Sequence, residues 1–118
     1  MESFYNGKNV LILGGAGFIG SNLAIALVRL GAHITIIDNL NKLYGGNLYN
    51  LSEISDSIEF IKDDIRNHGL LKDCLKKKQV IFDLVGQISY IDSLSMPYDD
   101  AMLNSVSHLV LLDLMKDI

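Results

Sequence analysis

The stretch Gly14-Gly15-Ala16-Gly17-Phe18-Ile19-Gly20-Ser21 decides the fold, because it joins an apolar run to a segment with helical periodicity. The run before it, Asn9-Val10-Leu11-Ile12-Leu13, is typical of a strand that is buried on both faces. Over residues 18–30 the apolar positions recur at helical spacing, and Gly31 then predicts the end of a helix. The glycines therefore lie in a turn that leads from a strand into a helix.

The rest of the chain continues this alternation of strands and helices. Such alternation predicts parallel strands that are joined by right-handed crossovers. We therefore expect residues 1–118 to form one α/β domain, a truncated Rossmann-type open parallel sheet of about four strands in the order 3-2-1-4 with helices on both faces. The further strands are expected at residues 33–37, 57–61 and 79–85, and the further helices at 48–52, 66–77 and 98–115, the last after a loop that ends at Met96-Pro97.

Composition limits the class of protein. With 49% apolar and 20% charged residues, the 118-residue chain can build a packed core, which excludes general disorder. The net charge is −4 and no basic block exceeds Lys76-Lys77-Lys78, which argues against nucleic-acid binding. No apolar run has the length of a membrane span. Cys74 is the single cysteine and cannot form an internal disulfide, which fits a cytoplasmic location.

The spacing of Gly14, Gly17 and Gly20 fits a loop that binds a diphosphate. Glycine in the turn lets the backbone approach the phosphates closely. The free N–H groups of the first helical turn, at the positive end of the helix dipole, then bind the anion without a cationic side chain. A later glycine allows close packing of the helix against the sheet. A glycine-rich turn without a ligand is the alternative, but the position between a strand and a helix favours a dinucleotide.

Asp38 ends the second expected strand and follows Gly20 by 18 residues. A carboxylate at this place can accept hydrogen bonds from both hydroxyls of an adenosine ribose, and it repels a 2′-phosphate, so NAD is favoured over NADP. Alternatively, Asp38 caps the following turn. The histidines His33, His68 and His108 are dispersed and no cysteines are paired, so we expect no metal site.

These residues resemble the extended short-chain dehydrogenase/reductase family and, within it, the NAD-dependent nucleotide-sugar epimerases and dehydratases. The glycine spacing is that family's version and differs from the Gly-x-Gly-x-x-Gly of medium-chain dehydrogenases. The resemblance covers nearly the whole chain and implies NAD as the cofactor. The residues that it assigns to the cofactor are Gly14, Gly17, Phe18, Ile19, Gly20, Asp38, Asn39, Asp64, Ile65, Leu84, Val85, Gly86 and Asn104.

Four segments carry the resemblance beyond the glycine loop. Asp38-Asn39-Leu40 is similar to the family's ribose-binding Asp-Asn-Leu, and Asp64-Ile65-Arg66 to an Asp-Ile-Arg whose first two residues meet the adenine. Leu84-Val85-Gly86-Gln87 stands where the family has Leu-Ala-Ala-Gln beside the nicotinamide half, and Asn104 matches the first residue of Asn-Val-x-Gly-Thr. The alternatives are structural: Asp64 as a helix N-cap, Leu84 and Val85 as strand core, and Asn104 as an exposed polar residue.

The chain also departs from the family pattern. Asp83 replaces a common histidine, and Ser107-His108 replaces the usual Gly-Thr. Catalysis in the family is attributed to a Ser or Thr with a Tyr-x-x-x-Lys pair, in which the lysine lowers the pKa of the tyrosine. No tyrosine of this chain has a lysine four residues later. We therefore expect no catalytic residue within these 118 residues.

The resemblance implies the amino-terminal NAD-binding part of a nucleotide-sugar epimerase or dehydratase, in which NAD transiently takes a hydride from the sugar. We expect such a part to lack the substrate domain and to be inactive alone. A non-catalytic NAD-binding sensor or regulatory module is the alternative, and a fragment that binds nothing is a third. Helix faces left bare by truncation predict a homo-oligomer, and they carry Leu109, Leu111, Leu112 and Leu114.

Overall fold

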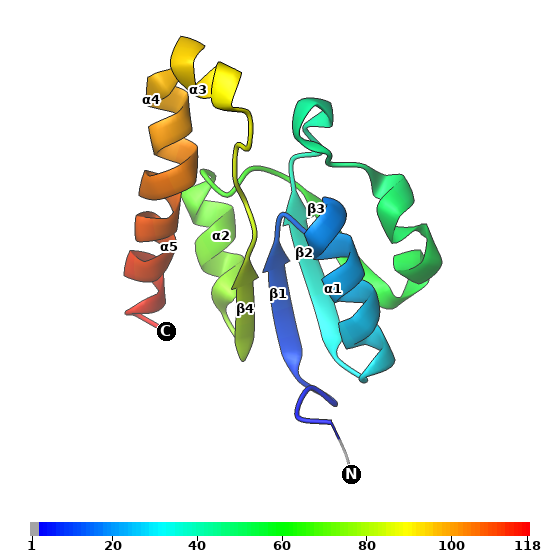
Figure 1. The fold of residues 1–118 in the computed structure, drawn as a ribbon. Coiled ribbons are helices and arrows are strands. Elements are labelled where there is room, and N and C mark those ends of the chain that lie inside the picture. Colours follow the sequence, from blue (N-terminus) through cyan, green and yellow to red (C-terminus); the bar gives the residue numbers. More distant parts are fainter. Residues whose placement is uncertain (1–2) are drawn as a thin grey trace.

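The structure, a computed structural model that describes residues 3–118, is built on one parallel sheet of four strands (Figure 1). The strand order is β3-β2-β1-β4, which confirms the predicted order 3-2-1-4. In register, Leu13 lies opposite Ile37 on one side and Asp83 on the other, so the strands end together at one edge. The strands are β1 (Asn9–Leu13), β2 (His33–Asp38), β3 (Ile58–Lys62) and β4 (Val80–Asp83).

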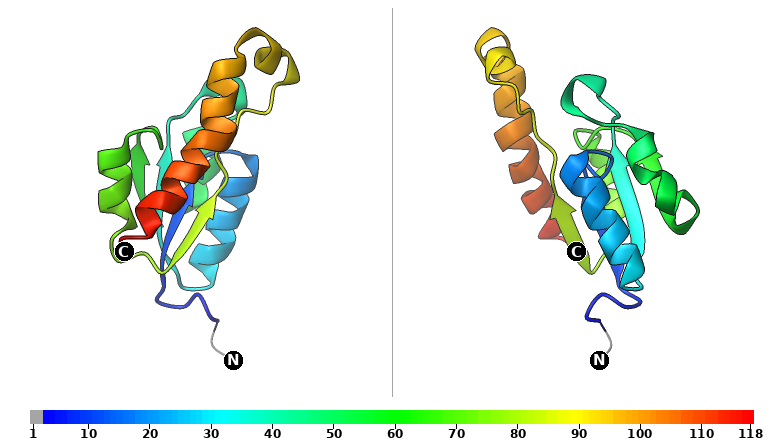
Figure 2. Two further views of the ribbon diagram at one scale, coloured as in Figure 1. Left: turned by 90° about the vertical axis from the view of Figure 1, so that its left-hand side faces the viewer. Right: turned by 45° about the vertical axis from the view of Figure 1, so that its right-hand side comes forward.

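Helices cover both faces of the sheet, as predicted (Figure 2). On one face lie α1 (Phe18–Arg29) and the 3₁₀ segment η2 (Leu48–Ser57). On the other face lie α2 (His68–Leu75) and α5 (Ser107–Met115). This division into two apolar layers explains why β1 reads as a continuous apolar run.

Side chains of β1 alternate between the two layers. Val10 and Ile12 pack into the layer beneath α1, together with Leu27. Leu11 and Leu13 pack into the opposite layer, together with Leu111 of α5. These four apolar side chains of β1 are fully buried, and β1 is therefore the centre of the fold.

The helices differ from the predicted ranges mainly at their ends. The helix expected at 66–77 is α2, which begins after Asn67, whose Oδ1 accepts from the backbone N–H of Leu70 at 3.3 Å. Lys77, beyond its end, has a φ of 66°, which no helix continues through. The helix expected at 48–52 forms as the longer 3₁₀ segment η2.

The segment after β4 is more helical than the sequence predicted. A short helix, α3 (Tyr90–Ser95), forms where a loop was expected, and the Ser89 hydroxyl caps it by accepting from the N–H of Asp92 at 3.2 Å. The helix expected at 98–115 forms as three consecutive segments: α4 (Pro97–Ala101), the π-helical turn η3 (Met102–Val106) and α5.

The outer face of α5 carries exposed apolar side chains. Leu109 is 64% and Leu112 59% exposed, as expected. Leu111 is buried in the core and Leu114 packs against the same cluster, so their expected exposure was wrong. Within residues 3–118, no helix is long and apolar enough to cross a membrane.

Candidate functional site

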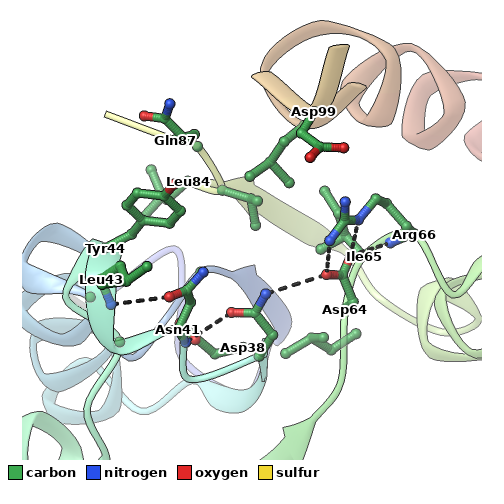
Figure 3. A pocket seen from close by; sticks show the side chains of 18 of the residues that line it. Asp38, Asn41, Leu43, Tyr44, Asp64, Ile65, Arg66, Leu84, Gln87 and Asp99 are labelled. Carbon is green, nitrogen blue, oxygen red and sulfur yellow. Dashed lines mark hydrogen bonds and ion pairs between the residues drawn. The ribbon is translucent and has the colours of Figure 1, made fainter. Parts of the chain in front are cut away.

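A cavity of about 360 Å³ lies at the carboxyl ends of the strands, between α4 and the loop that follows β2 (Figure 3). The segments that leave all four strands contribute to its wall: the glycine loop and residues 38–46, 63–66 and 84–87. Open α/β sheets bind their ligands at this edge. The volume falls within the range that small-molecule and cofactor sites occupy.

Most of the predicted cofactor residues meet at this cavity. Its wall includes Gly14, Gly17, Asp38, Asn39, Asp64, Ile65, Leu84, Val85 and Gly86. Four predicted residues are not part of the wall: Phe18, Ile19, Gly20 and Asn104.

Three glycines of the loop are required by the protein's own packing: Gly15 by the Ile36 side chain, whose Cγ2 would lie 2.6 Å from an added Cβ, and Gly14 and Gly20 by backbone atoms. Gly14 has a φ of +76°, and a Cβ there would lie 2.9 Å from the carbonyl oxygen of Leu84. A Cβ on Gly20 would lie 2.3 Å from the carbonyl oxygen of Gly14. The sequence predicted close packing of the helix against the sheet, whereas the close approach of Gly20 is to the loop itself.

Gly17 is different, because its surroundings leave room for a side chain. Its φ is −79°, and a Cβ would meet only the carbonyl oxygen of Gly14, at 3.6 Å, which is an ordinary contact. Gly17 nevertheless lines the cavity. A side chain at this position would therefore take space from a ligand and not from the protein.

The start of α1 presents unpaired backbone donors. Gly17 is the N-cap residue and provides no side-chain cap, and the first helical hydrogen bond runs from Ser21 N–H to the Gly17 carbonyl at 3.0 Å. The N–H groups of Phe18, Ile19 and Gly20 consequently have no partner within the helix. The side chains of Phe18 and Ile19 are 82% and 67% exposed and do not line the cavity. What these two residues offer a ligand is therefore their backbone N–H groups.

Asp38 is almost buried at the end of β2, where it holds two backbone segments. One carboxylate oxygen accepts from the N–H of Ala16 at 2.9 Å, and the other from the N–H of Leu40 at 2.8 Å. The alternative of a turn cap is therefore confirmed as a contact. It does not exclude ribose binding, because a carboxylate has about four acceptor positions and Asp38 still lines the cavity.

Asp64 and Arg66 form an ion pair on the cavity wall (Figure 3). The Asp64 carboxylate accepts from Arg66 Nε at 2.8 Å and Nη2 at 2.6 Å, and from Asn39 Nδ2 at 3.3 Å. The hydrogen bonds from Arg66 lower the pKa of Asp64 to about 2. The alternative role of Asp64 as a helix N-cap is wrong, because Asn67 caps α2.

The segment after β4 is held in place by Asn104. Its Oδ1 accepts from the N–H of Gln87 at 2.7 Å, and its Nδ2 donates to the carbonyl of Gln87 at 2.9 Å. Gln87 in turn lines the cavity beside Gly86. The cofactor contact of Asn104 stays a prediction, and the structure gives this side chain a positioning role.

Sequence reasoning missed the contact between Tyr44 and Asp92, which joins the loop after β2 to the helix α3. Tyr44, in the loop after β2, donates its hydroxyl to Asp92 Oδ2 of α3 at 3.1 Å. Loss of solvent and this neighbouring carboxylate raise the pKa of Tyr44. The pattern Ser89-x-x-Asp92 could have predicted the start of α3. No local pattern predicts the contact with Tyr44, which is 48 residues away.

Two departures from the family pattern form one contact. Asp83, at the end of β4, pairs through Oδ2 with Nδ1 of His108 on α5. These two departures, 25 residues apart in the sequence, therefore lie in contact in the structure. Among residues 3–118 no group of three His, Cys, Asp or Glu side chains could hold a metal ion.

Known proteins of similar sequence are nucleotide-sugar enzymes. The sequence profile of the GDP-mannose 4,6 dehydratase family matches residues 11–118. The chain is 40% identical over 99 residues to a UDP-glucose 4-epimerase of Mycolicibacterium smegmatis, a match that covers 81% of this chain and 31% of that protein. It is 34% identical over 110 residues to a CDP-paratose 2-epimerase of Salmonella typhi, and this match covers 91% of this chain and 32% of that protein. The chain thus spans about a third of the length of these relatives.

Solved structures of similar fold include the Bordetella bronchiseptica enzyme WbmF in complex with NAD+. The TM-score is 0.85 at 28% identity, with 97% of this chain and 34% of that one covered. An epimerase from Methanothermobacter thermautotrophicus has a TM-score of 0.84 at 35% identity, and the match covers 93% of this chain and 32% of that one. Profile, relatives and structures agree, and the chain belongs to the family of NAD-dependent nucleotide-sugar epimerases and dehydratases.

Proposed function

We propose that this chain binds NAD across the carboxyl ends of β2, β1 and β4, as the cofactor-binding part of a nucleotide-sugar epimerase or dehydratase. The single observation that carries this proposal is Gly17, which lines the cavity and has room for a side chain that the protein itself does not exclude. The diphosphate would lie there, on the free N–H groups of Phe18 and Ile19 at the start of α1.

The remaining predicted residues fit the two ends of the dinucleotide. Asp38 retains acceptor positions for the hydroxyls of the adenosine ribose. Asp64 and Ile65 would lie against the adenine, and Leu84 with Val85 would lie against the nicotinamide half. The segments that leave all four strands line the cavity, so it extends across the whole sheet edge. A site of this extent supports a dinucleotide such as NAD over a mononucleotide.

NAD supplies a hydride acceptor when it is bound, and this chain's residues would hold and orient it. The relatives are epimerases and a dehydratase of nucleotide sugars. We propose a nucleotide sugar as the substrate and epimerisation or dehydration as the reaction of a protein of their length. The general base would come from residues outside this sequence. Exposed Leu109 and Leu112 support a homo-oligomer, and the single cysteine supports a cytoplasmic location.

Calorimetric titration of NAD into the wild-type chain and into Gly17→Ala tests the proposal. We expect the wild type to bind NAD and Gly17→Ala to bind at least about tenfold more weakly, with a melting temperature within a few degrees of the wild type because the added Cβ meets only ordinary contacts. Equal affinities in the two proteins, or no binding to the wild type, would overturn it.

A further inference from the structure

We infer that Asn50 is a positioning residue for the diphosphate site, an inference that rests on the proposed function. Asn50 lies in η2, outside the wall of the cavity, and no pattern in the sequence pointed to it. Its Nδ2 donates to the carbonyl oxygen of Ala16, in the middle of the glycine loop, at 2.9 Å. The residue therefore acts on the loop and not on a ligand directly.

The Ala16 carbonyl is held from one side by two donors. The backbone N–H of Asn47 also donates to it, at 3.2 Å, so both acceptor positions of this oxygen are filled. On the preceding peptide, the Ala16 N–H donates to Asp38. Ala16 is fully buried, and both of its backbone polar groups are held, the N–H by the last residue of β2 and the carbonyl by the start of η2.

This arrangement fixes the peptide between Ala16 and Gly17, which leads into the backbone donors of Phe18 and Ile19. The Ala16 carbonyl and the Gly17 N–H belong to one trans peptide, so they point in opposite directions, and the Gly17 N–H donates within the loop to the Gly14 carbonyl at 3.5 Å. Glycines flank Ala16 on both sides, and their backbone freedom lets this peptide rotate at little steric cost. A rotated peptide would break this bond and bring two carbonyl oxygens together, which would disturb the turn that leads into the N–H groups of Phe18 and Ile19. Asn50 opposes that rotation, since it binds the oxygen on the side of η2.

The test compares Asn50→Asp with Asn22→Asp. Aspartate has the shape of asparagine but cannot donate to the Ala16 carbonyl. Asn22 offers a matched control, because its Nδ2 also donates to a backbone carbonyl, that of Phe18 at 2.7 Å, and the substitution adds the same charge near the same loop. Should Asn50→Asp fail to fold, Asn50→Ser removes the reach of the side chain without adding a charge.

Two ligands separate a positioning role from a general structural one. We expect Asn50→Asp to weaken NAD at least about tenfold and adenosine, followed by NMR titration, less than about twofold, because Asp38 keeps its bond to the Ala16 N–H. Asn22→Asp should change NAD affinity less than threefold. In the free protein, amide exchange at Gly17 should become faster in Asn50→Asp.

The outcomes distinguish this inference from the proposed function. If Asn50→Asp weakens NAD and adenosine binding equally, the role of Asn50 is overturned. It is also overturned if this variant changes neither the NAD affinity nor the amide exchange at Gly17. In both cases the proposed function stands as long as the wild type binds NAD. Failure of the wild type to bind NAD would overturn both.

Discussion

Gly20→Ala should destabilise the protein, although alanine is the better helix former. Gly20 lies in the first turn of α1, where the added Cβ would be 2.3 Å from the carbonyl oxygen of Gly14 and 2.7 Å from Cα of Gly15. Ordinary contact begins at 3.4 Å, so the helix and the loop must separate by roughly 1 Å. Both neighbours are backbone atoms, and Gly14 is held by its N–H bond to Ile37 at 2.9 Å.

The size of the effect follows from two opposing contributions. Overpacking of a well-packed site costs up to about 3 kcal/mol, and replacing a helical glycine by alanine gains up to about 1 kcal/mol. We expect a net loss of about 2 kcal/mol in the free energy of unfolding. At roughly 4 °C per kcal/mol for a chain of this size, the melting temperature should fall by about 8 °C.

Gly69→Ala is the matched control for this substitution. Gly69 lies in the first turn of α2, where a Cβ would meet only Asn67 Oδ1 at 3.9 Å. The same chemical change should therefore leave the free energy of unfolding unchanged or raise it by up to about 1 kcal/mol. Thermal and urea unfolding, followed by circular dichroism, measure both variants. A Gly20→Ala protein as stable as Gly69→Ala would refute the close-packing argument.

Asp38→Ala should lower the ratio of NAD to NADP affinity at least about tenfold, because loosening of the loop affects both cofactors and cancels in the ratio; calorimetry that gives an unchanged ratio would contradict the ribose assignment. The pKa of Asp64 is lowered to about 2 from 3.8, so its ion pair stabilises the fold above about pH 4 and this contribution is lost as the pH falls toward 2. Arg66→Ala should raise that pKa toward 3.8 in an NMR titration, and an unmoved pKa would mean that Arg66 is not the cause. A double-mutant cycle of Asp83→Ala and His108→Ala should give a coupling of about 1 kcal/mol, since both side chains are less than a third exposed. A coupling near zero would show that the two departures from the family pattern are independent.

The sheet and most of the site were predictable because their signals are local. Runs such as residues 10–13 are apolar throughout, which is typical of a strand covered on both faces. Parallel strands end at one edge, so residues that follow them, such as Asp38 and Asp64, had to lie near one another. The order and direction of the strands were therefore enough to predict that these residues form one site.

The contacts that sequence reasoning missed depend on side chains that meet from distant segments. Asn50 is 34 residues from the Ala16 carbonyl that it binds, and Tyr44 is 48 residues from Asp92. Neither pair has a spacing that marks it. The sequence offers two roles for Asp38, a ribose contact and a turn cap, and a carboxylate has enough acceptor positions for both.

A crystal structure of this chain grown with NAD would show directly whether the strand ends hold the cofactor. We expect the diphosphate within hydrogen-bond distance of the N–H groups of Phe18 and Ile19, beside Gly17, with the adenosine ribose on Asp38 and the nicotinamide half beside Leu84. NAD bound elsewhere, or in the reverse direction across the strand ends, would contradict this expectation, as would crystals that hold no NAD at saturating concentration.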